Sequence, residues 1–221
     1  MSGPSRREAV LPREIIARVL DVIGTDLIVV GGQALAYWMD HYSVSMPAEF
    51  SYVSHDLDLL ARSAAGSDDV RRIARAIGGR SVLPQRRAAL TALVGQAVKE
   101  ISPEEFYNVD VLHTVYGAEG DIRGRAVEVE AREGLRFRVM HPLDVLKSRL
   151  DNLYGLREKQ NELGRAQLAA GIEVARAFLG DAEAGRPRLR YLKVIRKLAR
   201  SDAGKKVATR YGIRVADLLN P

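Results

Sequence analysis

The chain has 221 residues, of which 47% are hydrophobic and 28% are charged, a composition typical of a soluble globular protein. The absence of cysteine excludes disulfides, cysteine-ligated zinc and thiol nucleophiles. No secretory signal is visible near the N-terminus, and the apolar stretch 27–30 is too short to span a bilayer. We therefore expect a cytoplasmic protein with no membrane partner, built as one large domain or one domain with an appendage.

The net charge of +6 is concentrated near the C-terminus. Residues 186–221 contain eleven Lys or Arg and two Asp or Glu, whereas the remainder contains 23 basic and 26 acidic residues. A strongly basic segment on a mildly acidic body indicates a polyanionic partner. The alternative is a solvated basic helix face with no partner.

The first 141 residues mix helix and strand patterns, in which apolar residues recur at helical spacing or gather in short buried runs. Turn signals at 102–104 and 132–134 separate paired strands. In chain order we expect a helix at 12–23, a strand at 27–30, a helix at 33–40, a loop at 43–52, a strand at 53–60, a helix from an N-cap at Ser67 to 77, and strands at 90–101, 105–113, 126–131 and 135–140.

From Pro142 onward we find no strand pattern. We expect helices at 142–156, 161–179, 188–200 and 215–219, with a linker-like stretch at 180–187. The expected fold class is α+β, with a mixed β-sheet flanked by helices and a C-terminal helical part. We place the domain boundary near 141, which gives an α/β domain at 1–141 and a helical region with a basic tail at 142–221.

Two carboxylates stand two residues apart in an apolar segment. Asp56 and Asp58 lie in the sequence Ser54-His55-Asp56-Leu57-Asp58-Leu59-Leu60. In a strand, residues i and i+2 point to one face, so the two aspartates project together while the leucines project to the other side. Adjacent carboxylates repel each other, and a divalent cation bound between them removes that repulsion. Magnesium prefers such oxygen ligands together with substrate phosphates.

A third carboxylate, Asp110, is embedded in the apolar sequence Asn108-Val109-Asp110-Val111-Leu112. A buried Asp is costly unless it is paired or binds a metal. If its strand neighbours that of Asp58, the three acids can hold two metal ions, one for an attacking hydroxyl and one for a triphosphate. The sequence therefore predicts a site for Mg2+ or Mn2+ formed by Asp56, Asp58 and Asp110.

Gly31 and Gly32 follow the first apolar strand and precede a predicted helix. Glycines at such a turn let the backbone approach a phosphate, and a helix N-terminus offers free N–H groups. The simpler interpretation is a tight turn. There is no Gly-x-Gly-x-x-Gly pattern, Walker A loop, His-Glu-x-x-His motif or Ser/His/Asp hydrolase motif.

Taken together, Gly31-Gly32 after the first strand, Ser54-x-Asp56-x-Asp58 on the next and Asp110 on a later strand resemble the DNA polymerase beta-like nucleotidyltransferase superfamily. Within it, the chain resembles the AbiEii-type and minimal nucleotidyltransferase branch of bacterial toxin–antitoxin and phage-defence systems. The resemblance covers roughly residues 13–180. The segment at 141–150 is similar to that branch's first C-terminal helix. Residues 40–52 form an extra loop, and the stretch 156–161 lacks the Lys-Asp pair common in that branch.

The resemblance implies a nucleotidyltransferase fold and roles for particular side chains. Asp56 and Asp58 would bind the metal, and Asp110 would be the third acid, acting on the nucleophile. Ser54 would contact phosphate or orient Asp56. The remaining nucleotide-binding residues implied are Gly31 and Gly32, at the phosphates, and Lys147, which would help to hold the nucleotide.

The expected function is therefore metal-dependent transfer of a nucleoside monophosphate from a nucleoside triphosphate (NTP) to an acceptor. The basic tail makes RNA, and tRNA first, the expected acceptor, because Lys and Arg contacts to phosphate give sequence-independent affinity. Protein AMPylation and a non-catalytic nucleic-acid-binding module are the alternatives. A cognate antitoxin is a further expected partner in a toxin–antitoxin setting.

Several residues have a simpler structural interpretation beside the functional one. We expect His55 to pack rather than to catalyse, because a regular strand points it away from the aspartates. His113, three residues after Asp110, is a candidate for the rim of the site. Lys147 on a helix would ordinarily be solvated. Tyr37 and Trp38 are expected in the core.

Overall fold

The computed structural model describes residues 6–50, 54–84, 92–118, 120–131, 134–182 and 186–219. Within these ranges the protein is α+β, with a mixed open sheet of eight strands and eight α-helices. The chain forms two compact units. The first unit comprises Met1–Ala34, Tyr52–Val115 and Arg123–Met140, and the second comprises Leu35–Ser51, Tyr116–Ile122 and His141–Pro221.

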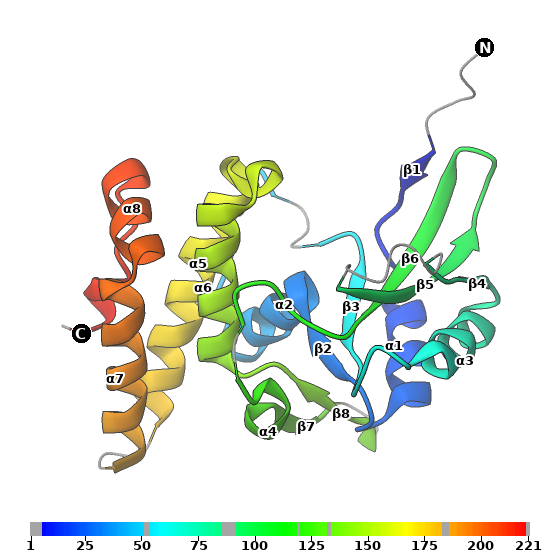
Figure 1. The fold of residues 1–221 in the computed structure, drawn as a ribbon, viewed down its shortest axis with the longest axis horizontal. Helices are drawn as coiled ribbons and strands as arrows, with labels where there is room; N and C mark the ends of the chain where they lie inside the picture. The colour runs from blue at the N-terminus through cyan, green and yellow to red at the C-terminus, as the bar shows by residue number, and fades with distance from the viewer. Residues whose placement is uncertain are drawn as a thin grey trace. The chain divides into compact units, whose positions relative to one another are not determined.

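All eight strands belong to the first unit (Figure 1). The strand order is β4-β5-β6-β3-β2-β8-β7, and β1 pairs in parallel with β6. Both parallel and antiparallel pairs occur, since β3 runs parallel to β6 but antiparallel to β2. The strands are β1 (Arg7–Glu8), β2 (Ile28–Val30), β3 (Leu57–Leu60), β4 (Arg80–Val82), β5 (Leu93–Glu100), β6 (Glu105–Leu112), β7 (Val127–Glu130) and β8 (Arg136–Val139).

Two amphipathic helices pack on the sheet of the first unit, α1 (Arg13–Ile23) and α3 (Ser67–Ile77). In each helix the apolar residues recur at helical spacing, and those residues are the buried ones. α3 contacts β4, β5 and β6, while α1 contacts β8 and α3. Together the two helices bury one apolar face of the sheet.

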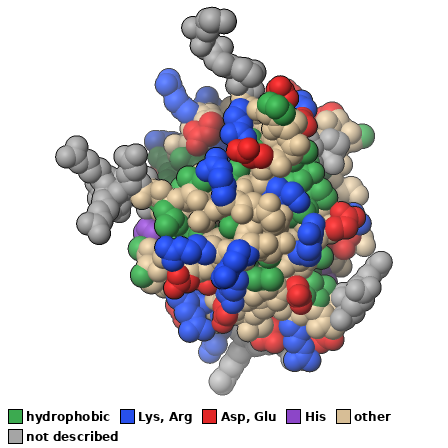
Figure 2. Space-filling view, turned by 90° about the vertical axis from the view of Figure 1, so that its right-hand side faces the viewer, with side chains coloured by type: hydrophobic (Ala, Val, Ile, Leu, Met, Phe, Trp, Pro, Cys, Tyr) green, Lys and Arg blue, Asp and Glu red, His purple; other side chains and the backbone are tan. Residues whose placement is uncertain are grey.

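The surface of the first unit mixes both signs of charge. Figure 2 shows the side that carries α3 and β4, where Lys and Arg side chains alternate with Asp and Glu. Three exposed or half-exposed ion pairs account for part of this pattern: Arg71–Asp68, Arg72–Asp69 and Arg80–Glu100. Such a surface is solvated and has no large field of one sign.

The second unit is a helical bundle. α5 (Pro142–Gly155) packs against α6 (Glu162–Asp181) and α8 (Asp202–Tyr211), and α7 (Arg186–Arg200) packs against α8. Two 3-10 helices, η3 and η4, cover residues Arg157–Lys159 and Val215–Leu219. The core of this bundle consists of buried aliphatic residues from α5, α6, α7, α8 and η4, including Leu146, Leu150, Leu168, Ile195 and Val207.

Two helices link segments of different units. α2 (Gly31–His41) begins in the first unit and ends in the second. The short α4 (Ile122–Arg125) begins in the second unit and ends in the first. The last passage of the chain between the units falls between Met140 and His141.

Two sequence expectations are corrected. Of the strand expected at 53–60, the described residues 54–56 are not part of the strand, which begins at Leu57, because its partner β2 pairs only as far as Val30↔Asp58 and then turns into α2. α3 is capped at Gly66 without a side-chain hydrogen bond, so Ser67 is the first helical residue and not the N-cap.

Five elements have no counterpart among the expected ones: β1, β4, α4, η3 and α8. Parts of the expected loop at 43–52, the strand at 90–101, the turn at 132–134 and the linker at 180–187 lie outside the described residues. None of the described helices has the length and hydropathy needed to cross a membrane.

Candidate metal site

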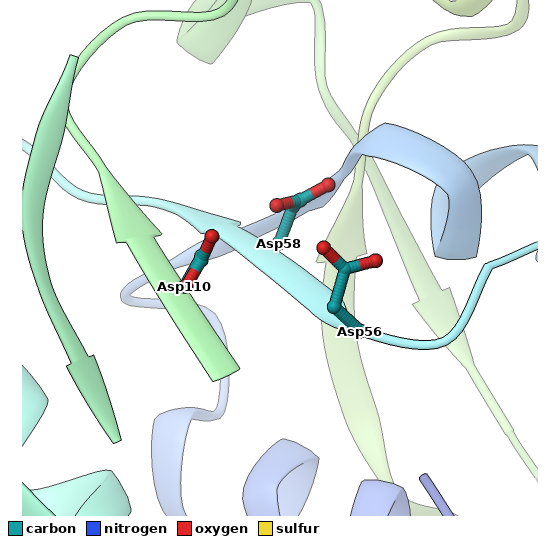
Figure 3. A group of neighbouring side chains, drawn as sticks. All are labelled: Asp56, Asp58 and Asp110. Carbon is teal, nitrogen blue, oxygen red and sulfur yellow. The ribbon is translucent and has the colours of Figure 1, made fainter. Parts of the chain in front are cut away.

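The three aspartates lie together at the centre of the sheet (Figure 3). Asp58 on β3 is directly opposite Asp110 on the parallel strand β6, and Asp56 precedes β3 by one residue. One carboxylate oxygen from each residue lies within 4.8 Å of the other two. All three side chains are half-buried. This spacing matches what a shared cation requires of three oxygen ligands.

Alternation along the strands explains why these carboxylates share a face. Leu57, Leu59, Val109 and Val111 are fully buried, and they flank the aspartates in sequence. Their side chains point to the opposite face of the sheet from Asp58 and Asp110. The side of Val111 is the one that α3 covers, since Gly95, its neighbour on β5, lies against Val70 of α3. Apolar burial on one face therefore fixes the carboxylates on the other.

Position 31 requires glycine because its backbone lies against the side chain of Asp58. Its φ of +64° lies in the left-handed region, which glycine adopts without strain. A Cβ at this position would lie 1.9 Å from Asp58 Oδ2. The next residue, Gly32, is equally restricted, because a Cβ there would lie 2.4 Å from the Cβ of Ser54. The two glycines thus make room for Asp58 and Ser54, and their contact with a phosphate stays a prediction.

Ser54 is placed to orient Asp56. Its hydroxyl donates a hydrogen bond to Asp56 Oδ1, at 2.5 Å. The side-chain amide of Gln33, in the first turn of α2, donates to the backbone carbonyl of Ser54 at 3.4 Å. Asp56 lies outside the strand, so these contacts, and not the sheet ladder, set the direction of its carboxylate.

Asp110 is held by two amides. The side-chain amides of Gln96 on β5 and of Asn108 on β6, the strand of Asp110 itself, donate to Asp110 Oδ1 at 2.9 and 2.8 Å. Burial raises the pKa of Asp110 above its ordinary value, the two amides oppose that rise, and the charge of Asp56 adds to it. A carboxyl in this position binds a dication more readily as the pH rises, because binding requires the charged form.

A fourth carboxylate, Glu8, was missed by the sequence analysis. β1 pairs with β6, with Glu8 beside Phe106 in the ladder. Burial raises the pKa of Glu8, the charges of Asp56 and then Asp110 also raise it, and a hydrogen bond with Asn108 opposes the rise. The carboxylate oxygen Glu8 Oε1 is buried and has no hydrogen-bond partner among the described residues. Glu8 therefore adds negative charge to the site.

The chemistry of this site suits a hard divalent cation. The candidate ligands are three aspartates, which supply only oxygen atoms, and this group includes no His or Cys. Burial and mutual repulsion both disfavour the charged state, as the raised pKa values of Glu8 and Asp110 indicate. A dication held by Asp56, Asp58 and Asp110 would neutralise that charge.

Lys147 belongs to the second unit and is engaged there. On α5 its ammonium group forms an ion pair with Asp151 Oδ2 at 2.7 Å and also donates to the carbonyl of Gly117. The neighbouring Ser148 donates to the carbonyl of Tyr116. Lys147 therefore anchors the loop at 116–117 to α5, and its contact with a nucleotide stays a prediction.

Other histidine and aromatic residues have structural contacts. His55 accepts a backbone hydrogen bond from Leu11 through its carbonyl. His141 is the N-cap of α5, where its Nδ1 accepts from the Leu143 N–H. Trp38 is buried, and its ring contacts the neighbouring Tyr37.

No protein family matches the chain, and no curated protein matches it significantly.

Proposed function

We propose that the protein is a metal-dependent nucleotidyltransferase that moves a nucleoside monophosphate from an NTP to an acceptor hydroxyl. The observation that carries this proposal is the convergence of Asp56, Asp58 and Asp110, with ligand oxygens within 4.8 Å of one another. Two carboxylates on neighbouring strands and a third just before one of them, beside a Gly-Gly turn that opens a helix, suit a magnesium–triphosphate complex.

Each residue has a proposed part in the reaction. Asp56 and Asp58 would hold Mg2+, which would neutralise charge that develops on the phosphate oxygens. Asp110 accepts the proton of the acceptor hydroxyl. The acceptor oxygen forms a bond to the α-phosphorus, the bond to the bridging oxygen breaks, and pyrophosphate leaves with the electron pair. Ser54 keeps Asp56 oriented through their hydrogen bond.

The remaining assignments depend on the same proposal. Gly31 and Gly32 would contact the triphosphate, and Lys147 would leave its ion pair with Asp151 to hold the nucleotide. RNA, with tRNA first, is the proposed acceptor because the C-terminal helices carry the excess of positive charge. A protein hydroxyl is the alternative acceptor, and a toxin–antitoxin or defence role would give the protein a cognate antitoxin.

The test is transfer of label from α-labelled NTPs, each supplied with Mg2+, to bulk RNA or to lysate protein. The variant Asp56→Ala/Asp58→Ala is expected to lose transfer by about a hundredfold or more. Glu128→Ala/Glu130→Ala is the matched control, since it removes two exposed carboxylates, also two residues apart, from β7. No transfer by the wild type, or equal transfer by the two variants, would refute the proposal.

A non-catalytic nucleic-acid-binding module is the second candidate. It is favoured by the basic C-terminal helices and disfavoured by the complete triad. RNA binding that needs no Mg2+, together with no label transfer to any acceptor, would support this candidate over the enzyme.

A further inference from the structure

A pocket of about 400 Å³ lies in the second unit, between the end of α5 and α8. Its size falls within the range of small-ligand sites. None of its residues belongs to the candidate metal site. The lining residues are Leu153, Tyr154, Lys205, Lys206, Val207, Thr209, Arg210 and Tyr211.

The charge of this pocket is of one sign. Lys205, Lys206 and Arg210 line it, and no Asp or Glu does. Within the part of the chain that the structure describes, no carboxylate forms an ion pair with any of these three cations. This contrasts with the first unit, where many of the exposed Arg side chains are paired with acids. Cations gathered around a concave surface without counter-charges favour an anionic ligand.

Two aromatic rings give the pocket flat apolar surfaces. Tyr154 is 37% exposed, and the ammonium of Lys206 lies 5.4 Å from the centre of its ring. The guanidinium of Arg210 lies 5.1 Å from the ring of Tyr211. Arg210 is further fixed by a hydrogen bond to the Gln160 side chain, whose amide donates to the Tyr154 carbonyl. Lys206, Arg210 and the two rings are therefore held together before any ligand arrives.

A ligand that satisfies both features has a phosphate and a flat base. Phosphate groups bind Lys and Arg, and bases stack on tyrosine rings without sequence preference. Aliphatic anions would use the cations alone, and a neutral aromatic ligand would use the rings alone. We propose that this pocket binds a nucleotide unit, with its phosphate at Lys205, Lys206 and Arg210 and its base at the tyrosine rings.

The nucleotide unit can come from a free mononucleotide or from a strand of RNA, and a binding experiment separates the two sources. The protein carries Asp56→Ala/Asp58→Ala and is kept in EDTA, so nucleotide bound at the metal site does not contribute. Anisotropy of a short fluorescein-labelled single-stranded RNA gives its Kd. Calorimetry with AMP, CMP, GMP and UMP gives the affinity of the free nucleotides.

Removing the pocket cations is expected to weaken binding much more than removing cations elsewhere. The variant Lys205→Ala/Lys206→Ala/Arg210→Ala should raise Kd by about tenfold or more. The matched control, which removes the same charge from exposed positions on α7, should raise it less than about threefold. That control is Lys193→Ala/Arg196→Ala/Lys197→Ala. Thermal unfolding of both variants checks that the bundle is intact.

Tyr154 tests the stacking part of the proposal. Tyr154→Phe keeps the ring and should leave Kd within about twofold of the parent, whereas Tyr154→Ala should raise Kd by about fivefold or more. Binding of RNA alone identifies a strand as the source, and binding of mononucleotides identifies a free nucleotide. No binding of either probe up to about 1 mM, or equal weakening by the pocket and α7 variants, would overturn the proposal. Because no transfer reaction is measured, this result is independent of the proposed enzymatic activity.

Discussion

Replacing Gly31 by alanine tests whether the Gly-Gly turn is shaped by the carboxylates. The φ of +64° costs an alanine about 1–2 kcal/mol. The new methyl group would also overlap Asp58, whose Oδ2 lies 1.9 Å from the position of the Cβ. Moving the aspartate off its rotamer costs about 0.5–1.5 kcal/mol more. We therefore expect Gly31→Ala to lower the free energy of unfolding by about 1.5–3.5 kcal/mol, the sum of these two ranges.

Gly78 provides the matched control. Its φ is +65°, and a Cβ there would contact nothing within 4 Å, so Gly78→Ala measures the backbone strain alone. Thermal unfolding in EDTA compares the two variants. For a protein of this size each 1 kcal/mol lowers Tm by about 2–4 °C, so the Tm of Gly31→Ala should be about 3–14 °C below that of the wild type.

A double variant isolates the overlap with the carboxylate. Asp58→Ala removes the two side-chain atoms nearest to the new methyl group, so adding it to Gly31→Ala should recover about 0.5–1.5 kcal/mol of the loss. Gly31→Ala should also lose the Tm increase that Mg2+ gives the wild type, because the displaced aspartate is a metal ligand. If Gly31→Ala is no less stable than Gly78→Ala, the close packing of Gly31 against Asp58 is refuted.

Three further predictions concern charge. Asp110→Asn should raise Tm in EDTA at neutral pH and flatten the pH dependence of Tm. The pKa of Asp110 is raised in the folded state, so the wild type loses stability as the pH rises from the unfolded-state pKa to the folded-state pKa. A lower Tm for the variant would contradict this. Glu8→Gln should likewise raise Tm in EDTA at neutral pH, since the pKa of Glu8 is raised too. The same substitution should weaken Mg2+ binding, measured by calorimetry, by about two- to fivefold. Unchanged Mg2+ affinity would mean that the charge of Glu8 does not act on the metal. Lys147→Met should lower the free energy of unfolding by about 1 kcal/mol, and Asp151→Asn should cost little more when added to it; additive losses by urea unfolding would mean that the ion pair is not the shared cause.

The central part of the site could be predicted because its signals are local. Asp58 and Asp110 are each flanked by residues that the sheet buries, so alternation alone indicates a shared face. Their register, with Asp58 opposite Asp110, depends on long-range pairing that no short window contains. Asp56 lies outside β3, so strand geometry, from which its direction was predicted, does not orient it. Its carboxylate shares the site because the Ser54 hydroxyl orients it.

Elements formed by distant partners were not predictable in this way. β1 is two residues long, and it forms only because β6 offers a free edge at Glu105 and Phe106. The sequence around Glu8 contains no periodicity that would indicate a strand.

α8 did carry a local signal, since Ser201 caps it by accepting from the Gly204 N–H and Gly212 ends it in the left-handed conformation. Its many basic residues weaken the apolar pattern.

The attachment of β1 has a consequence for the dynamics of the metal site. The segment that carries Glu8 is held by its pairing with β6, by the ion pair of Arg7 with Glu105 and by backbone hydrogen bonds that include Ala9 N–H to Phe106 and Leu11 N–H to His55. A strand of only two residues, paired along one side, opens locally at a lower free energy than the central strands of the sheet. Each opening removes one negative charge from beside Asp56 and Asp110. Amide hydrogen exchange at Ala9 and Leu11 therefore reports how often the site alternates between its more and less acidic forms.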